Sequence, residues 1–201
     1  IHAKVAADAE NNWINGLMAT ALDRFAPYFN AYTFVLSRQQ EYEADAAASR
    51  IAGTEPNASG LIRDELLGRW IAEDFWPRLY AQAGTAPQPR FMPYAALRTA
   101  CAAAHADWAT AERLKLALKQ ESGLDDTHPC LRERLEAIEG KTALPTIPER
   151  SAAEALLGSF ARTLVDEFDH QWWEENRAGW QSQHHRQTMA TQRLAELQRR
   201  P

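Results

Sequence analysis

Two carboxylates in the segment EYEAD have the spacing with which a helix presents side chains together. If residues 37–53 are helical, Glu41 and Asp45 lie four residues apart on one face, and Glu43 points to nearly the opposite side. Like charges at this spacing repel each other slightly. A solvated face tolerates them, whereas a face presented to a metal ion or an arginine would use them. Taken alone, EYEAD favours the solvated face, because short acidic patches on helices are common.

The residues around EYEAD complete a longer motif: Ser37, Arg38, two variable residues, Glu41, two more residues, Ala44 and Asp45. This pattern resembles the helix that supplies the third zinc ligand in the zinc metallopeptidases typified by HtpX and the CAAX prenyl endopeptidases. The resemblance implies that Glu41 is a metal ligand. It also implies that Asp45, one turn later, accepts the second ring N–H of a zinc-binding histidine and so fixes its orientation.

A second stretch, THPCLRERLEAI, resembles a later motif of the same family, a His-Pro pair with an arginine six residues after the histidine. It carries His128, Pro129 and Arg134, and it departs from the family at Cys130, where a second proline is usual. The resemblance implies that His128 and Arg134 position a peptide carbonyl or stabilise the oxyanion of the tetrahedral intermediate. Together the two stretches, residues 30–53 and 125–140, cover about a fifth of the chain.

The chain lacks the H-E-x-x-H motif that supplies two histidines and the general base in such enzymes. It has six histidines, and no two are separated by three residues. Because a catalytic zinc ion commonly takes three protein ligands, Glu41 alone cannot hold it. We therefore expect zinc in the intact parent protein and none on this chain alone, which should be proteolytically inactive.

Two explanations remain open for the missing motif. The favoured one is that the chain is a C-terminal fragment of a membrane-associated zinc metalloendopeptidase whose H-E-x-x-H helix lies upstream of Ile1, a position without an initiator methionine. The alternative is a non-catalytic helical interaction or scaffold module derived from the same fold. A third and weaker possibility is an unrelated helical bundle that binds a small ligand, with Glu41 and Asp45 facing water.

The resemblance also implies the partners: a protein or peptide substrate and the H-E-x-x-H segment of the same parent. It implies a membrane-associated parent, attached through regions outside this chain, with this segment soluble and cytoplasmic. Without the metal-site helix a surface that the parent buries would be exposed. We therefore expect self-association, or disorder between Ile1 and Asn30.

The composition limits the classes of function. The net charge is -5 and the pI is about 5.7, so no overall basic surface is available to hold a nucleic-acid backbone. Apolar residues make up 45% of the chain, which is typical of a globular protein with a core. The charge-free stretches are shorter than the roughly 20 residues that a membrane-spanning helix needs. Cys101 and Cys130 are read as ordinary thiols, because two cysteines make no disulfide framework.

The elements that must position these residues are helical. Proline and glycine gather at residues 53–60, 84–93, 122–129 and 140–149, which predicts four loops. Between them apolar residues recur at helical spacing, and no segment alternates as a half-buried strand does. The sequence thus predicts an all-α, irregular helical domain with a long C-terminal helix. We expect the metallopeptidase-like region at residues 1–147 and a helical extension at 148–201.

Three apolar stripes mark the faces that should be buried. They comprise Ile62, Leu66, Trp70, Phe75 and Leu79; then Leu131, Leu135 and Ile138; and then Leu157, Phe160, Leu164, Phe168 and Trp172. Farther along the last helix, Trp173 and Trp180 share a face. That face is predicted to pack against residues 61–83, the alternative being a lipid interface or another domain.

Overall fold

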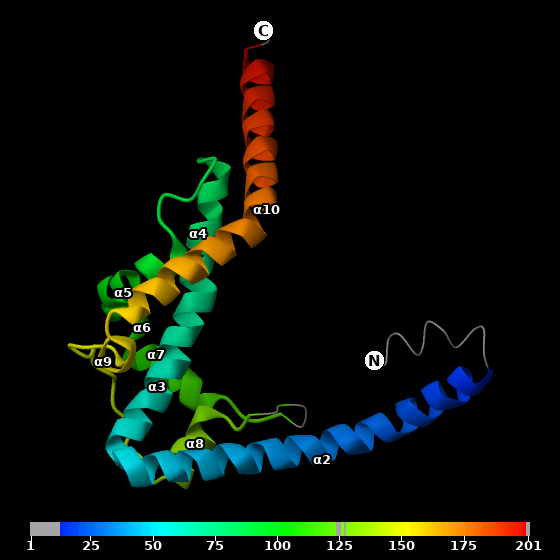
Figure 1. Ribbon diagram of the computed structural model, residues 1–201, viewed down its shortest axis with the longest axis vertical. Coiled ribbons are helices and arrows are strands. Elements are labelled where there is room, and N and C mark those ends of the chain that lie inside the picture. Colours follow the sequence, from blue (N-terminus) through cyan, green and yellow to red (C-terminus); the bar gives the residue numbers. More distant parts are fainter. Residues whose placement is uncertain (1–12, 124–125, 127, 200–201) are drawn as a thin grey trace. The chain divides into compact units, whose positions relative to one another are not determined.

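Helices are the only regular elements in the part of the chain that the structure describes. The structure is a computed structural model, and it describes residues 13–123, 126 and 128–199. The last element, α10 (Phe160–Gln198), is 39 residues long. The predicted all-α fold with a long C-terminal helix is therefore confirmed (Figure 1).

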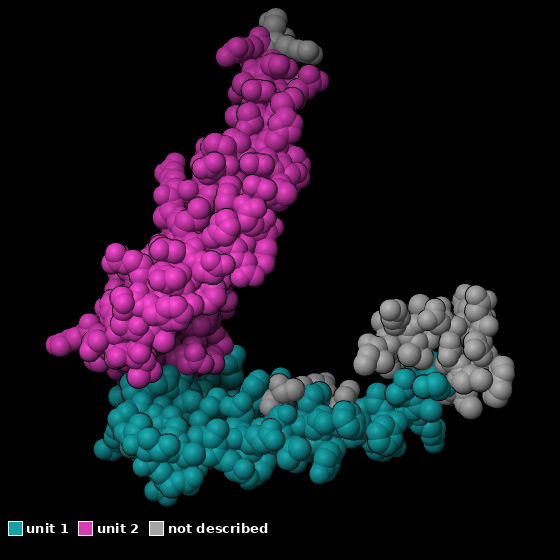
Figure 2. Space-filling model, in the orientation of Figure 1, with its two compact units in different colours: residues 1–62, 115–143 teal, residues 63–114, 144–201 magenta. Residues whose placement is uncertain are grey.

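The chain divides into two compact units, each made of two separate stretches of sequence. Unit 1 comprises residues 1–62 and 115–143, and unit 2 comprises residues 63–114 and 144–201 (Figure 2). These units are defined by contacts within the chain. The predicted boundary at 147–148 is a different one, because it marks where the peptidase-like region should end, and it stays a prediction.

Unit 1 is built on α2 (Trp13–Ala52), which has 40 residues. Near its C-terminal end it packs against α8 (Leu131–Ala137) (Figure 1). The predicted stripe on α8 is confirmed, because Leu131, Leu135 and Ile138 are all buried. Burial of this face stabilises the position of α8. The packing of α8 against α2 brings together side chains about 90 positions apart.

The predicted loop at residues 53–60 is wrong, since α3 (Thr54–Trp70) begins directly after Gly53. Gly53 has a φ of 95°, a left-handed conformation that glycine adopts without steric cost and that commonly ends a helix. Pro56 lies in the first turn of α3, where a missing backbone N–H removes no intrahelical hydrogen bond. A single residue therefore interrupts the helices, and Pro56 belongs to the second one.

The apolar stripe at residues 61–83 is confirmed, and its irregular spacing has a structural cause. All five of its residues are buried. Their spacing is four residues except between Trp70 and Phe75, where it is five. At that point the chain forms a π-helical turn, Ile71–Phe75, before α4 (Trp76–Ala81). The wider turn accommodates the extra residue and keeps both halves of the stripe on the buried side.

The core of unit 2 is aromatic. Leu79 and Ala83 pack against Trp172 and Trp180 of α10, with Trp173 partly buried against them. Ala83 lies in the short 3-10 helix η3 (Gln82–Gly84). The predicted packing of the tryptophan face against residues 61–83 is thus confirmed.

The stripe predicted at the start of the last helix is largely wrong. The segment is divided into α9 (Ala152–Leu157) and α10 at Gly158, which has a φ of 55°. Leu157, Phe160 and Phe168 are exposed, whereas Trp172 is buried. The register of burial is set by contacts of α10 with η3 and with α5 (Pro93–Ala103), two contacts that helical periodicity alone does not reveal.

The remaining helices among the described residues are short. They are α6 (His105–Trp108) and α7 (Ala111–Lys119). Within the described residues no helix combines the length and the apolar character that crossing a bilayer requires.

Candidate catalytic-site cluster

Glu41 and Asp45 lie on one face of α2, as their spacing predicts. Alanine-rich sequence follows them, which favours an uninterrupted helix through this segment. The two carboxylates differ in environment: the Glu41 side chain is 27% exposed, whereas that of Asp45 is 5% exposed. A carboxylate as buried as Asp45 needs a charged or hydrogen-bonding partner.

Arg134 of α8 is that partner. Its Nε and Nη2 atoms donate to Oδ2 and Oδ1 of Asp45 at 2.7 and 2.8 Å, a bidentate pair. Its Nη2 also lies 3.2 Å from Oε2 of Glu41. One guanidinium group therefore binds both carboxylates and offsets the repulsion between them.

His128 completes the cluster. Its Nδ1 lies 2.9 Å from Oε1 of Glu41, and its side chain is 71% exposed. An ionised carboxylate only accepts hydrogen bonds, so Nδ1 must carry the proton. In the neutral imidazole this leaves the lone pair on Nε2, the atom that can accept a hydrogen bond or bind a metal ion.

Two groups hold the segment that carries His128. Arg38 of α2 donates two hydrogen bonds to this segment. Its Nε donates to the backbone oxygen of Asp126 at 3.0 Å, and its Nη2 donates to the backbone oxygen of Gly123. The hydroxyl of Ser122 accepts the backbone N–H of Cys130 at 2.8 Å. The Arg38 of the Ser-Arg pair therefore has a structural role here, since it positions the chain that leads to His128.

A further contact between α2 and α8 involves residues that the sequence analysis did not single out. The hydroxyl of Tyr42 donates to Oε2 of Glu133 at 3.3 Å, and Oγ of Ser122 donates to the same oxygen at 2.7 Å. Burial, together with the negative charge of Glu133, raises the pKa of Tyr42 above its usual value of 10.0. In the sequence Tyr42 directly follows Glu41, and Glu133 directly precedes Arg134. This adjacency is the signal by which the pair could have been predicted.

The comparison with known protein families agrees with this cluster. The family model described as Peptidase family M48 matches residues 2–142, a range that includes all four residues. The chain belongs to peptidase family M48. No curated protein and no solved structure matches it.

Membership of family M48 confirms the predicted resemblance to metallopeptidases of the HtpX and CAAX prenyl type. Peptidases of this family are zinc-dependent. The structure brings together all four residues that the motifs indicated. Their individual roles, with Glu41 as ligand, Asp45 beside a histidine, and His128 and Arg134 toward substrate, stay predictions.

Within the described part of this M48 chain, the residues do not by themselves make a zinc site. Among those that the structure describes, no group of three histidine, cysteine, aspartate or glutamate side chains is placed to hold a metal. Near Glu41 the available donors are its own oxygens and the imidazole of His128, while both oxygens of Asp45 are bound by Arg134. A complete site would require ligands from outside the described residues.

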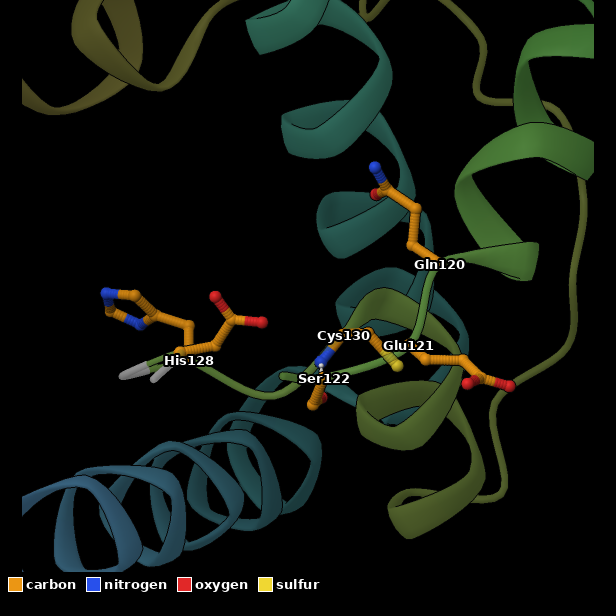
Figure 3. A pocket seen from close by; sticks show the side chains of 6 residues that line it. Gln120, Glu121, Ser122, His128 and Cys130 are labelled. Atoms are coloured by element: carbon orange, nitrogen blue, oxygen red, sulfur yellow. Dashed lines mark hydrogen bonds between the residues drawn. The ribbon is translucent and has the colours of Figure 1, made fainter. Parts of the chain in front are cut away.

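A pocket of about 340 Å³ lies beside the cluster in the M48 chain (Figure 3). Its lining includes His128 and Cys130 from the segment before α8, and Ser122, whose hydroxyl meets the Cys130 N–H. The other lining residues are polar or acidic: Gln120, Glu121 and Asp126. The exposed imidazole of His128 therefore borders both the Glu41 carboxylate and a polar recess.

Proposed function

We propose that this chain supplies the carboxylate side of the catalytic centre of a zinc metalloendopeptidase, and that the centre is completed by an H-E-x-x-H segment. In this proposal Glu41 is the third protein ligand. The bound zinc ion would supply an activated water for peptide-bond hydrolysis. The supporting observation is that two motifs more than 80 residues apart converge, with His128 and Arg134 both on the carboxylate of Glu41.

The contacts of Glu41 suit a metal ligand whose carboxylate is preorganised before the metal binds. His128 and Arg134 each contact one of its oxygens, and each oxygen of a carboxylate has two lone pairs. The carboxylate can thus keep both contacts and still offer a lone pair to a metal. Arg134, anchored on the buried Asp45, fixes the orientation of Glu41.

His128 is the residue placed to meet a substrate. It is the most exposed of the four side chains, and it borders the pocket next to Glu41. A peptide group near Glu41 would lie within reach of an imidazole that hydrogen bonds to the same carboxylate. A protonated imidazole would donate from Nε2 to the peptide carbonyl, whereas the neutral form could only accept the peptide N–H. The guanidinium of Arg134 would act mainly as a positioning group, because Asp45 binds it at two points.

The alternative is a non-catalytic interaction module of the same fold. It is favoured by the absence of H-E-x-x-H from the sequence and by the lack of a three-ligand group among the described residues. Attachment of the parent to a membrane, and a cytoplasmic position of this segment, belong to the proposal as implications of the family resemblance.

The first experiment is to determine the reading frame upstream of the codon for Ile1. The proposal requires an H-E-x-x-H motif there. A frame that starts near Ile1, or one without the motif, would overturn the proposal and favour the interaction module.

The second experiment measures zinc and peptidase activity in the complete protein encoded by that frame. Glu41→Ala should abolish activity and lower the zinc content, whereas Glu43→Ala, on the opposite side of the same helix, should change neither. Equal zinc content and activity in the two variants would exclude Glu41 as a ligand. A complete protein that binds zinc but cleaves no peptide would exclude the peptidase function.

A further inference from the structure

The N-terminal half of α2 carries a continuous apolar face that is exposed. Seven large side chains on it are between 45% and 75% exposed: Met18, Phe25, Tyr28, Phe29, Tyr32, Val35 and Leu36. Scattered exposed apolar residues are normal on a protein surface, but a contiguous patch indicates an interaction site. Here the rings of Phe25 and Phe29 are already in contact, with centroids 6.2 Å apart.

The apolar residues of this face follow a seven-residue repeat over three cycles. The first position is occupied by Met18, Phe25 and Tyr32, the fourth by Ala21, Tyr28 and Val35, and the fifth by Leu22, Phe29 and Leu36. Every one of these nine positions, named here the α2 seam, is apolar or aromatic. A heptad of this kind forms the stripe with which one helix packs along another.

The α2 seam lies on the opposite side of the helix from the catalytic-site cluster. Glu43 is seven residues after Leu36 and therefore continues the seam side. Glu41 and Asp45 are each two residues from Glu43, about 200° around the helix. A segment that completed the metal site at Glu41 would thus approach the other face of α2, so the seam calls for a separate partner.

We propose that the α2 seam binds the α2 seam of a second copy of this chain, antiparallel to it. The area is sufficient. With an aromatic side chain contributing about 200 Å², the seven large residues expose on the order of 800 Å² per chain, which is about the share of one partner in a stable interface.

The side-chain sizes favour the antiparallel arrangement. In an antiparallel pair the first heptad position of one helix faces the fourth position of the other. Tyr32 then faces Ala21, Met18 faces Val35, and Phe25 faces Tyr28. Large residues thus meet small or medium ones at both ends, and two aromatic rings meet at the centre. In a parallel pair Ala21 would face Ala21 between the larger layers of Met18 and Phe25 and leave a gap.

The charges argue against a lipid surface as the partner. Between Trp13 and Ser37 the only charged residues are Asp23 and Arg24, one of each sign. Helices that lie on membranes carry lysine or arginine along their polar face, which this helix does not. A neutral, aromatic seam is typical of a protein interface, where phenylalanine and tyrosine are enriched.

The experiment measures the mass of the 201-residue chain by sedimentation equilibrium, with wild type compared with three lysine or glutamate variants. Wild type should be a dimer at about 50 µM, because interfaces of this size have dissociation constants in the micromolar range or below. Phe25→Lys and Tyr28→Glu should each give a monomer. Ile51→Lys is the matched control, because Ile51 is an apolar residue of the same helix that is 88% exposed and outside the seam.

Mixing the two seam variants tests the arrangement. In the antiparallel register Lys at position 25 faces Glu at position 28 of the other chain, so an equimolar mixture of Phe25→Lys and Tyr28→Glu should recover the dimer. A monomeric wild type, or a dimer that both variants preserve, would overturn the proposal. Failure of the mixture to dimerise would overturn the antiparallel register. A monomer that co-sediments with neutral phosphatidylcholine vesicles would show a lipid partner instead.

This inference is independent of the proposed function. It needs neither zinc nor Glu41, and Glu41→Ala should leave the dimer intact. A failed dimer test would therefore leave the proposed peptidase role as it stands.

Discussion

Arg134 binds both oxygens of Asp45, a residue 89 positions earlier in the chain, at 2.7 and 2.8 Å. Asp45 is the more buried member of the pair. Removing one partner of such a pair leaves an uncompensated charge in a poorly solvated site, which costs far more than an exposed ion pair contributes. This contact therefore joins α2 to α8 and also orders the Glu41 carboxylate, which the same arginine meets.

Arg134→Met should lower the free energy of unfolding by about 3 kcal/mol, because Asp45 would lose its charged partner while staying buried. Urea unfolding followed by circular dichroism measures the change. Glu136→Met, at an exposed position of the same helix, is the control, and it should change stability by less than about 0.5 kcal/mol, as surface substitutions generally do. An equal effect of the two variants would contradict the assignment of the pair as the link between α2 and α8.

Asp169→Asn should destabilise unit 2. Although it lies on α10, Asp169 is 6% exposed, and its two oxygens accept the backbone N–H groups of Tyr94 and Ala95 at 2.8 and 3.0 Å. It thus caps the N-terminus of α5, where a negative charge is favourable. Since an amide accepts with only one atom, the expected loss is about 2 kcal/mol.

Thermal unfolding of Asp169→Asn and of Asp166→Asn, an exposed aspartate on the same helix, measures this difference. Asp166→Asn should behave as wild type. If the two variants unfold alike, the cap contributes nothing to stability.

Tyr42 should make stability depend on pH in the alkaline range. Its pKa is raised in the folded state, so the protonated form is favoured there more than in the unfolded chain. The stabilisation is fully present below a pH of about 10, the unfolded pKa, and is lost as the pH rises through the raised folded pKa. The difference in stability between wild type and Tyr42→Phe should therefore shrink above pH 10.

Glu133→Gln gives a second measurement of the same contact. It removes the negative charge and weakens the acceptor beside Tyr42, so ultraviolet titration should show a lower pKa for Tyr42 than in wild type. The shift would be partial, because burial is the larger cause of the raised pKa. An unchanged titration would argue against the Tyr42–Glu133 contact in solution.

Cys101 should react slowly with iodoacetamide. Burial raises the pKa of its thiol, and the thiolate is the reactive form. In the Cys130→Ser variant at pH 8, alkylation of Cys101 should be several-fold slower in the folded chain than in urea, because unfolding removes the burial. Mass spectrometry over time measures both rates. Equal rates would show that the folded chain does not protect this thiol.

Much of the fold follows from local sequence. Helical spacing predicted the buried faces of α3, α4 and α8. The π-helical turn at Ile71–Phe75, which explains the five-residue step from Trp70 to Phe75, was not predicted. The prediction failed at Pro56, which was read as part of a loop because proline usually breaks helices. In the first turn of α3, however, Pro56 removes no intrahelical hydrogen bond, and the helix continues through it.

The sequence by itself determined the helical class, the two motifs and the family, because these depend on residue types at short, regular spacing. It also placed Glu41 and Asp45 on one face of α2. Only the tertiary structure decided that Arg134 binds both carboxylates and that Asp169 caps α5. Contacts between residues 75 or more positions apart depend on how the intervening chain turns and packs, and local periodicity carries no information about that path.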